Sequence, residues 1–261
     1  MKLGFDMIAN YHSHTVRCGH ASGTERQYVE AAIEAGYKIL GFSDHTPYPF
    51  EERHVSRIRM RMQELADYCS TVRALKEEYA SDITIHLGLE AEYYPKYFDR
   101  LKAAAEDEGV EFFLLGQHFT GNEYDGVYAG MPGASEEVLR QYVSQSIEAM
   151  ETGAYLYFAH PDLICYDDGT DLYKEQMRLL CKAAKRLELP LEINLLGIWS
   201  KRHYPDPVFW EIAAEEGNEA ILGMDCHDPE KMYVPEAIEE AENMARRLGL
   251  RLLTDLELKL K

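Results

Sequence analysis

Histidine and carboxylate residues in this sequence follow short apolar segments, and several of them come in pairs two residues apart. His12 and His14 end the segment MIANYHSH, and Asp225 and His227 follow the segment ILGM. Residues i and i+2 of an extended chain point to the same face, so each pair directs two side chains at one point. Imidazole and carboxylate groups are ligands of zinc, iron and manganese ions. The pairs therefore favour a metal-dependent hydrolase over other classes of protein.

Four further apolar segments end in a residue of the same kind. His45 follows LGFSD, Glu90 follows HLGL, His118 follows LLGQ, and His160 follows YFA. The C-terminal ends of parallel strands in a barrel meet on one face. We therefore expect these side chains to converge with the two pairs on a single site.

The elements that must position these residues alternate between strand-like and helix-like segments. The expected strands are Met7–Tyr11, Ile39–Ser43, Ile83–Leu89, Phe112–Gly116, Tyr155–Ala159, Leu191–Asn194 and Ile221–Met224. The expected helices are Glu25–Ala35, Met60–Tyr79, Tyr97–Asp107, Ser135–Glu151, Asp171–Leu187, Pro207–Glu216 and Pro235–Leu248. Such alternation predicts a parallel sheet. Ligands at many strand ends favour a closed barrel over an open sheet, whose ligands gather in one crevice. We expect one α/β domain over residues 1–261, a seven-stranded TIM-like (β/α) barrel with its site at the C-terminal face.

The composition excludes several partners. The formal net charge is −19, whereas contacts with nucleic-acid phosphates need clustered Lys and Arg. The sequence has no apolar run long enough to cross a bilayer, and its first residues lack the pattern of an export signal. We therefore expect no nucleic acid and no membrane as partner. The oligomeric state is left unknown.

The five cysteines, Cys18, Cys69, Cys165, Cys181 and Cys226, contain no CxxC pair. An odd number without such spacing is typical of reduced thiols in a cytoplasmic protein. Cys226 lies between two candidate ligands and should point away from them. Cys18 is expected to be structural.

The motifs HSH, SDH, GLE, QHF, AHPD and GMDCH occur in this order at the expected strand ends. The series resembles the polymerase and histidinol phosphatase (PHP) family of metallohydrolases over nearly the whole chain. Residues Cys18–Phe50 are similar to the histidinol-phosphate phosphatase branch of that family. The resemblance implies a distorted seven-stranded barrel that holds up to three metal ions.

The resemblance also implies nine ligands for three divalent ions, which would be Zn, Mn or Fe. The first ion would be bound by His12, His14, Glu90 and Asp225. The second would be bound by His45, His160 and the bridging Glu90. The third would be bound by His20, His118 and His227.

The residues themselves leave alternatives open. Glu90 and Glu92 share a strand face, so only the resemblance selects Glu90 as the bridge. His118 is either a ligand or a hydrogen-bonding partner of the substrate, and His20 lies in a loop, where solvated histidines are common. Asn10 and Glu92 stand where the family often has Asp, and we interpret both as neighbours that support the ligands. His54, His86 and His203 lack a motif and are expected to be ordinary surface or core histidines.

The implied activity is that of a phosphomonoesterase that hydrolyses histidinol phosphate in histidine biosynthesis. Three divalent ions with two carboxylates and neutral imidazoles leave a local charge of roughly +4, which favours a dianionic phosphate. A hydroxide bridging two ions would attack phosphorus. The expected catalytic residues are Glu90, Asp225, His45 and His160, and the expected substrate-binding residues are Arg17, Arg202 and His118.

Two loops, residues 46–59 and 117–133, follow strands on the side of the expected site and are candidates to cover the substrate. Their candidate residues for the histidinol part are Tyr48, Phe50, Glu51, Glu52, Phe119, Asn122, Glu123 and Tyr124. Three other functions stay open. They are a PHP phosphoesterase acting on another small phosphate or a nucleotide, an amidohydrolase, and a barrel that binds without catalysis.

Overall fold

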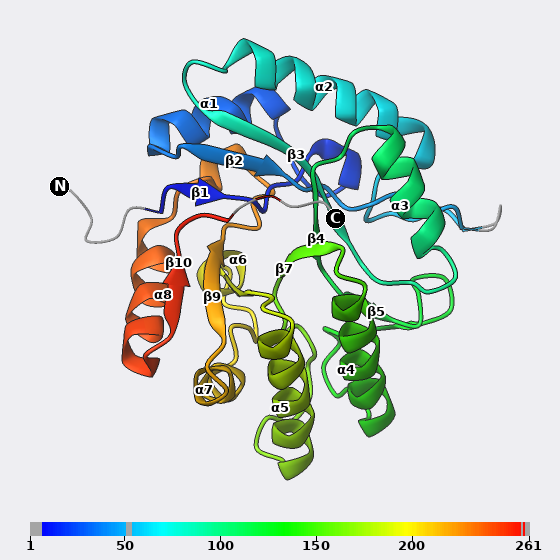
Figure 1. Cartoon of the computed structure of the whole chain (residues 1–261), viewed down its shortest axis with the longest axis vertical. Helices are drawn as coiled ribbons and strands as arrows, with labels where there is room; N and C mark the ends of the chain where they lie inside the picture. The colour runs from blue at the N-terminus through cyan, green and yellow to red at the C-terminus, as the bar shows by residue number, and fades with distance from the viewer. Residues whose placement is uncertain (1–6, 51–53, 257, 259–261) are drawn as a thin grey trace.

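The main sheet of the protein has eight parallel strands in the order β1-β2-β3-β4-β7-β8-β9-β10. The computed structural model describes residues 7–50, 54–256 and 258. The strands are β1 (Ala9–Asn10), β2 (Ile39–Phe42), β3 (Thr84–Ala91), β4 (Phe112–Leu115), β7 (Tyr155–Phe158), β8 (Leu191–Asn194), β9 (Glu219–Gly223) and β10 (Arg251–Leu253). Figure 1 shows that this sheet curls, with the long helices on its outer side. A short antiparallel hairpin, β5 (Phe119–Thr120) and β6 (Val127–Tyr128), stands apart from it.

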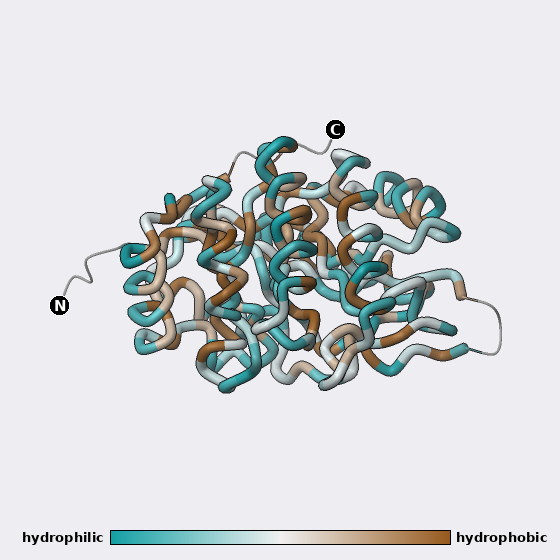
Figure 2. The backbone as a smooth tube through the Cα atoms, turned by 90° about the horizontal axis from the view of Figure 1, so that it is seen from below, coloured by the Kyte–Doolittle hydropathy of each residue, from teal (hydrophilic) through white to brown (hydrophobic). Residues whose placement is uncertain are grey.

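Helices follow the strands along the chain and form the outer layer. They are α1 (Glu25–Ala35), α2 (Leu65–Glu78), α3 (Phe98–Asp107), α4 (Glu136–Glu151), α5 (Asp171–Arg186), α6 (Leu195–Trp199), α7 (Pro207–Glu215) and α8 (Pro235–Leu248). Contacts within this layer join α1 to α2, α4 to α5, α5 to α7 and α7 to α8. Hydrophilic and hydrophobic stretches alternate along the helices (Figure 2), as expected for helices with one face on a core and one in water. Across the described residues, none of the helices has the length and apolar character needed to span a membrane.

The helix boundaries confirm the capping signals of the sequence. Thr24 caps α1 and forms a reciprocal capping box with Gln27. Gly36 ends the same helix with a φ of 94°, a left-handed conformation that glycine adopts without steric cost. The Ser135 side chain caps α4 in the expected place.

Strand β9 brings the two ends of the curled sheet together. On one side β9 pairs with β8, and on the other its residues Glu219–Ile221 pair with β10. Beyond β9, the amide of His14 donates to the carbonyl of Cys226 (2.9 Å), and the amide of Cys226 donates to the carbonyl of His12 (3.1 Å). The segment that follows β1 is thereby joined to the segment that follows β9, next to the candidate ligands.

The interior of the curl is filled by a small apolar cluster. Its buried members are Ala9, Tyr11, Phe112, Leu114, Tyr157, Ala159 and Ile221. The ring of Phe112 occupies space that a side chain on Gly41 or Gly88 would need. These two glycines therefore allow the interior to close around an aromatic ring.

The structure extends the predicted order of elements and corrects it in part. Each of the seven predicted strands is present, but β10, the hairpin of β5 and β6, and the short helix α6 were not predicted. The main sheet therefore has eight strands where the sequence predicts seven. The helix expected to begin at Met60 instead begins at Leu65, after a single 3-10 turn at Met62–Glu64. Elements of two to five residues span too little chain to show a hydrophobic period.

Candidate metal centre

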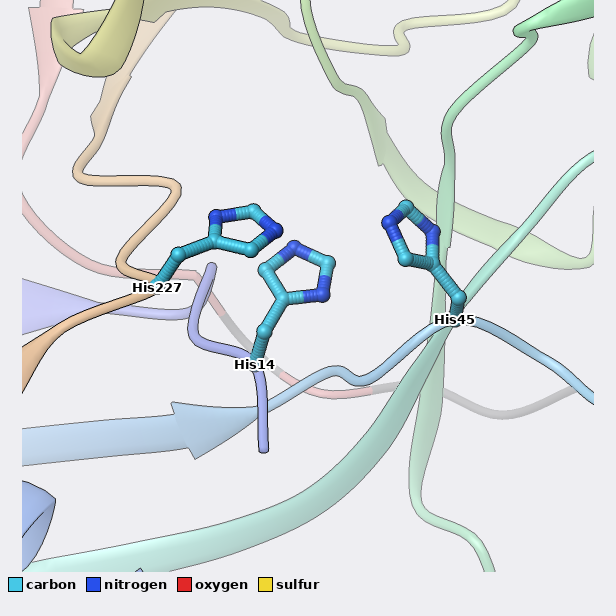
Figure 3. A group of neighbouring side chains, drawn as sticks. All are labelled: His14, His45 and His227. Carbon is cyan, nitrogen blue, oxygen red and sulfur yellow. The ribbon is translucent and has the colours of Figure 1, made fainter. Parts of the chain in front are cut away.

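Six parallel strands end beside one cluster of imidazole and carboxylate groups. Figure 3 shows three of the rings, from His14, His45 and His227, which follow β1, β2 and β9. The centroid of the His14 ring lies 3.9 Å from that of His227 and 4.4 Å from that of His45. One nitrogen of each ring lies within 4.8 Å of the others. Such spacing places the three rings in one compact centre of possible metal ligands.

One oxygen of Glu90 faces three imidazoles. This Oε2 atom lies 2.9 Å from Nδ1 of His45 and 3.6 Å from Nε2 of both His12 and His14. Glu90 is buried near the end of β3, and the three histidines come from the ends of β1 and β2. The carboxylate can therefore reach the ligands of more than one ion.

The other oxygen of Glu90 faces the opposite side of the cluster. Its Oε1 atom lies 2.8 Å from Nε2 of His160 and 3.6 Å from Nε2 of His118. A Cβ atom on Gly116, at the end of β4, would overlap this oxygen. The sheet thus leaves space for the carboxylate where a larger residue would displace it.

Asp225 forms the second anionic point of the cluster. Its Oδ1 atom lies 3.1 Å from Nε2 of His14, 3.5 Å from Nε2 of His12 and 3.3 Å from Nδ1 of His227. Its other oxygen accepts a hydrogen bond from Nδ2 of Asn194 (3.1 Å). Asp225 has a φ of 48°, a left-handed conformation that is strained for a residue other than glycine.

His20 lies at the exposed edge of the cluster. Its Nε2 atom lies 3.0 Å from Nε2 of His227, and its Nδ1 atom lies 3.0 Å from the carbonyl oxygen of Cys18. The loop histidine that sequence alone could not separate from a surface residue is therefore adjacent to a strand-end histidine. His118, by contrast, lies 13% exposed on the other side of Glu90.

Several atoms of the cluster that could bind a metal ion are buried without a hydrogen-bond partner among the described residues. These atoms are Nε2 of His12, Nε2 of His14, Nδ1 of His45, Nδ1 of His160 and Oε2 of Glu90. A buried polar atom without a partner is costly and needs an explanation. Metal coordination provides one, since these atoms are imidazole nitrogens and a carboxylate oxygen. The residues present therefore fit a centre of divalent ions.

The protonation states of Glu90 and His45 also suit the binding of divalent ions. Burial would raise the pKa of Glu90, but the nearby His45, His118 and His12 outweigh it, and the pKa lies well below its usual range. Burial lowers the pKa of His45 to about 4, although Glu90 opposes this shift. An anionic carboxylate beside a neutral imidazole is the protonation state that metal ligands require, and Glu90 with His45 has it. At His14 burial is outweighed by Asp225 and Asp44, which raise its pKa to about 9. A metal ion that binds this ring therefore displaces a proton.

A cavity of 660 Å³ opens onto the cluster. Candidate ligands in its wall are His20, His45, His118, His160, Asp225 and His227. Aromatic and apolar residues include Phe119, Tyr128, Leu163, Leu196 and Trp199. Arg202 and Lys231 also line the cavity. The cluster is therefore accessible to a small molecule that carries both a charged and an apolar part.

The comparison with known families agrees with the motifs of the sequence. A family model described as "PHP domain" matches residues 10–195. The chain belongs to the PHP domain family.

Curated relatives of this PHP domain extend the match. A Deinococcus radiodurans protein named "Probable histidinol-phosphatase" is 28% identical over 254 residues, which cover 92% of this chain and 95% of the relative. The "Histidinol-phosphatase" of Bacillus subtilis is 30% identical over 114 residues, or 41% of this chain and 42% of the relative. A solved structure of histidinol phosphate phosphatase from Lactococcus lactis, in complex with zinc, L-histidinol and phosphate, has a TM-score of 0.73 at 19% identity. That similarity covers 96% of this chain and 99% of the other, and it supports the fold.

The two arginines expected to bind substrate lie in different places in the PHP domain. Arg202 lines the cavity, where it donates a hydrogen bond to the hydroxyl of Tyr204 (2.6 Å). The guanidinium group of Arg17 instead pairs with Glu25 and with Asp67, and Arg17 is not part of the cavity wall. The sequence motifs did not single out Lys231, which takes a place in that wall because a 3-10 turn follows the last ligand.

The two loops provide less of the cavity than the sequence predicts. Phe119 lines it, as expected. Glu123 is instead engaged by His54, Ser56 and Arg59 of the other loop. Tyr48, Phe50, Asn122 and Tyr124 do not belong to the cavity wall, and Glu51 and Glu52 lie outside the described residues.

Two buried carboxylates that contact candidate ligands were missed. Glu192 on β8 lies 2.8 Å from Nδ1 of His12, and Asp44 lies 3.4 Å from Nδ1 of His14. Each fixes the orientation of a ring whose other nitrogen faces the cluster. Two features of the sequence could have indicated these carboxylates. Glu192 is a charged residue within the apolar strand LEIN, and Asp44 is the Asp of the motif SDH.

The two departures from the family pattern contact candidate ligands in different ways. Glu92 accepts a hydrogen bond from Nδ1 of His118 (3.2 Å), so it does support a candidate ligand. The side chain of Asn10 donates to the carbonyl oxygen of His12 and accepts from its amide (both 3.3 Å), so it supports a candidate ligand through the backbone. It also accepts from the amide of Met224 (3.0 Å), which joins the end of β1 to the segment after β9.

The remaining histidines have partners outside the cluster. His54 pairs with Glu123, His86 pairs with Glu111, and His203 faces the carbonyl oxygen of Leu163.

Two cysteines lie near the cluster. Cys226 turns its thiol to the carbonyl oxygen of Asp228, as expected from its place between two ligands. Cys18 is buried, and its sulfur lies within 4.8 Å of a ring nitrogen of both His20 and His227.

Proposed function

We propose that this protein is a metal-dependent phosphomonoesterase that hydrolyses histidinol phosphate to histidinol and phosphate. The observation that carries the proposal is the convergence of buried, unpartnered imidazole nitrogens on Glu90 beneath an open cavity. The names of the Deinococcus and Bacillus relatives support the choice of substrate. The Lactococcus structure supports it further, since that protein binds zinc, histidinol and phosphate.

We infer a centre of three divalent ions at the C-terminal ends of the curled parallel sheet, in one domain over residues 1–261. Its ligands would be His12, His14, His20, His45, Glu90, His118, His160, Asp225 and His227. Zn, Mn and Fe all accept this set of imidazoles and carboxylates. The short distances around both oxygens of Glu90 support its role as the bridging ligand.

When bound, the ions supply Lewis acidity toward the phosphoryl oxygens and increase the acidity of water. Glu90 and Asp225 are the carboxylates that would bind these ions. Arg202 and Lys231 line the cavity, and both carry positively charged hydrogen-bond donors. In this proposal they bind the phosphate on the side that faces away from the ions. The aromatic wall, which includes Trp199, faces the organic part of the substrate.

The proposed charge balance reconciles an anionic substrate with an acidic protein. The chain carries −19 overall, but three ions and two carboxylates leave a local charge of roughly +4. This positive region favours a small phosphate in the cavity. The acidic surface and the five free cysteines support a cytoplasmic enzyme without a nucleic-acid partner.

Removal and return of metal tests the proposal. Purified protein treated with a chelator should release no phosphate from histidinol phosphate, and addition of Zn, Mn or Fe should restore the release. A panel of other phosphomonoesters, including a nucleotide, serves as the comparison. Phosphate release that persists after complete metal removal would contradict the proposal, and preference for another ester would assign a different substrate to the same centre.

A further inference from the structure

Strand β8 differs from the strands around it because it contributes no proposed metal ligand. It carries instead Glu192, a carboxylate that is completely buried. Its Oε1 atom lies 2.8 Å from Nδ1 of His12 and accepts a hydrogen bond from the hydroxyl of Tyr157 (3.2 Å). Its Oε2 atom accepts from the amide of His160 (3.0 Å) and from Nδ2 of Asn194 (2.9 Å). One side chain thus contacts groups from three different strand ends.

The contact with His12 determines which ring nitrogen faces the centre. A carboxylate beside Nδ1 holds the proton on that nitrogen and leaves Nε2 free to bind metal. The Nε2 atom of His12 is buried, lies 3.6 Å from Glu90 and 3.5 Å from Asp225, and has no hydrogen-bond partner among the described residues. The geometry around Glu192 therefore prepares His12 as a ligand.

The same carboxylate holds the ligands on the two flanking strands. His160 follows β7 and Asp225 follows β9, and both have a left-handed backbone, with φ of 34° and 48°. Such conformations persist in residues other than glycine only where the surroundings fix them. Glu192 fixes the amide of His160 directly, and Asn194 donates to both Glu192 (2.9 Å) and Asp225 (3.1 Å).

The neighbouring strand leaves space for this arrangement. A Cβ atom on Gly223, in β9, would overlap Oε1 of Glu192. Glycine at this position lets the carboxylate lie under the cluster without displacement.

We propose that Glu192 is a positioning residue of the metal centre, which holds His12, His160 and Asp225 in the arrangement that binds the first two ions. The inference rests on the proposed metal centre, and it assigns a function to the one inner strand that carries no ligand. Because Glu192 acts through other side chains, its removal should weaken metal binding while the fold is kept.

The test compares zinc binding by metal-free wild type and Glu192→Gln, measured by competition with a chromogenic chelator and by the rise in Tm that zinc produces. Loss of a carboxylate that orients a ligand typically weakens metal affinity about 10- to 100-fold. We expect a decrease of this size, and a smaller zinc-dependent rise in Tm. Glu111→Gln is the matched control, because Glu111 pairs with Nδ1 of His86 (2.6 Å) away from the centre. The control should bind zinc as the wild type does.

Glu192→Asp is the second variant, and it decides the question if Glu192→Gln does not fold. It keeps the buried charge but withdraws the carboxylate from His12, so zinc affinity should again decrease. Wild-type zinc affinity in either folded variant would overturn the inference. If the wild type binds zinc but does not hydrolyse histidinol phosphate, the proposed function fails, while the zinc affinities still judge the role of Glu192.

Discussion

Glu90 is the residue on which most of the candidate ligands depend. Five imidazoles from four strand ends lie within 3.6 Å of its two oxygens. Burial opposes its negative charge, yet the neighbouring histidines keep its pKa well below the usual range. A carboxylate kept anionic in this way can balance the charge of two ions at once.

Glu90→Gln should therefore decrease phosphatase activity by more than about 100-fold, since this change removes a ligand and not only its support. The amide keeps the shape of the side chain, so the circular dichroism spectrum should not change. Asp225→Asn should act in the same direction. Either folded variant with near wild-type turnover and metal content would exclude that carboxylate from the centre.

Glu111 shows how a paired carboxylate outside the centre contributes to stability. Burial would raise its pKa, but hydrogen bonds from His86 and Lys76 outweigh this and lower the pKa to about 2. A carboxylate whose folded pKa is depressed stabilises the protein above its unfolded pKa. That contribution is lost as pH falls from about 4.5 toward 2.

Glu111→Gln should be less stable than the wild type at pH 7 by on the order of 1–2 kcal/mol, after allowance for solvent screening. The difference should shrink as pH falls toward 2 and vanish below it, because Glu111 then becomes protonated in the folded as well as the unfolded protein. Urea unfolding of the metal-free proteins at several pH values measures it. A difference that is constant from pH 7 to pH 2 would contradict the role of the ion pair.

At the scale of elements, Arg59 joins the loop after β2 to the end of β3 and to the β5–β6 hairpin region. It forms two hydrogen bonds of 2.8 Å with the carboxylate of Glu92, and its Nε atom donates to Glu123 (2.6 Å). The side chains of Arg59 and Glu92 are each only 1% exposed. Since Glu92 also contacts Nδ1 of His118, the pair of Arg59 and Glu92 helps to fix the orientation of this candidate ligand.

Arg59→Met should lower the free energy of unfolding by about 3–5 kcal/mol, because it leaves buried Glu92 without its cation. Arg26→Met removes an exposed pair with Glu78 and should leave the free energy of unfolding close to that of the wild type. Urea denaturation of both variants gives the comparison. If both variants lose the same small amount of unfolding free energy, Glu92 does not depend on Arg59 for its stabilisation.

The sequence predicts the strands and helices where a period is long enough to be detected. Each long helix from α1 to α8 follows an amphipathic run, and Thr24 and Ser135 mark two of the starts. The strands β5 and β6 and the helix α6 have only two to five residues, and tertiary contacts determine them. The pairing of β9 with β8 on one side and with β10 on the other likewise depends on where the curl ends.

At the scale of the molecule, the candidate site was predictable to the extent that its residues stand at strand ends. His12, Glu90 and Asp225 are close together because parallel strands direct their C-terminal ends to one face. The position of Arg17 was not predictable, since its partner Asp67 lies on a helix distant in sequence. The role of Glu192 required knowledge of which strands lie beside β8.

The whole molecule combines an acidic surface, a buried cluster of metal-binding groups and a cavity with an aromatic wall. This combination suits a substrate that joins a phosphate to a small ring-bearing chain. An enzyme shaped for such a molecule uses binding energy from the organic part to position the reacting phosphate. A general phosphatase would gain nothing from that part.

The most direct test is therefore kcat/KM of the metal-loaded protein for histidinol phosphate beside that for a simple aryl phosphate. Our account predicts that histidinol phosphate is preferred by at least about 100-fold, because its ammonium and imidazole groups contribute binding energy in the transition state. Equal values for the two esters would contradict the claim that this centre is built for histidinol phosphate.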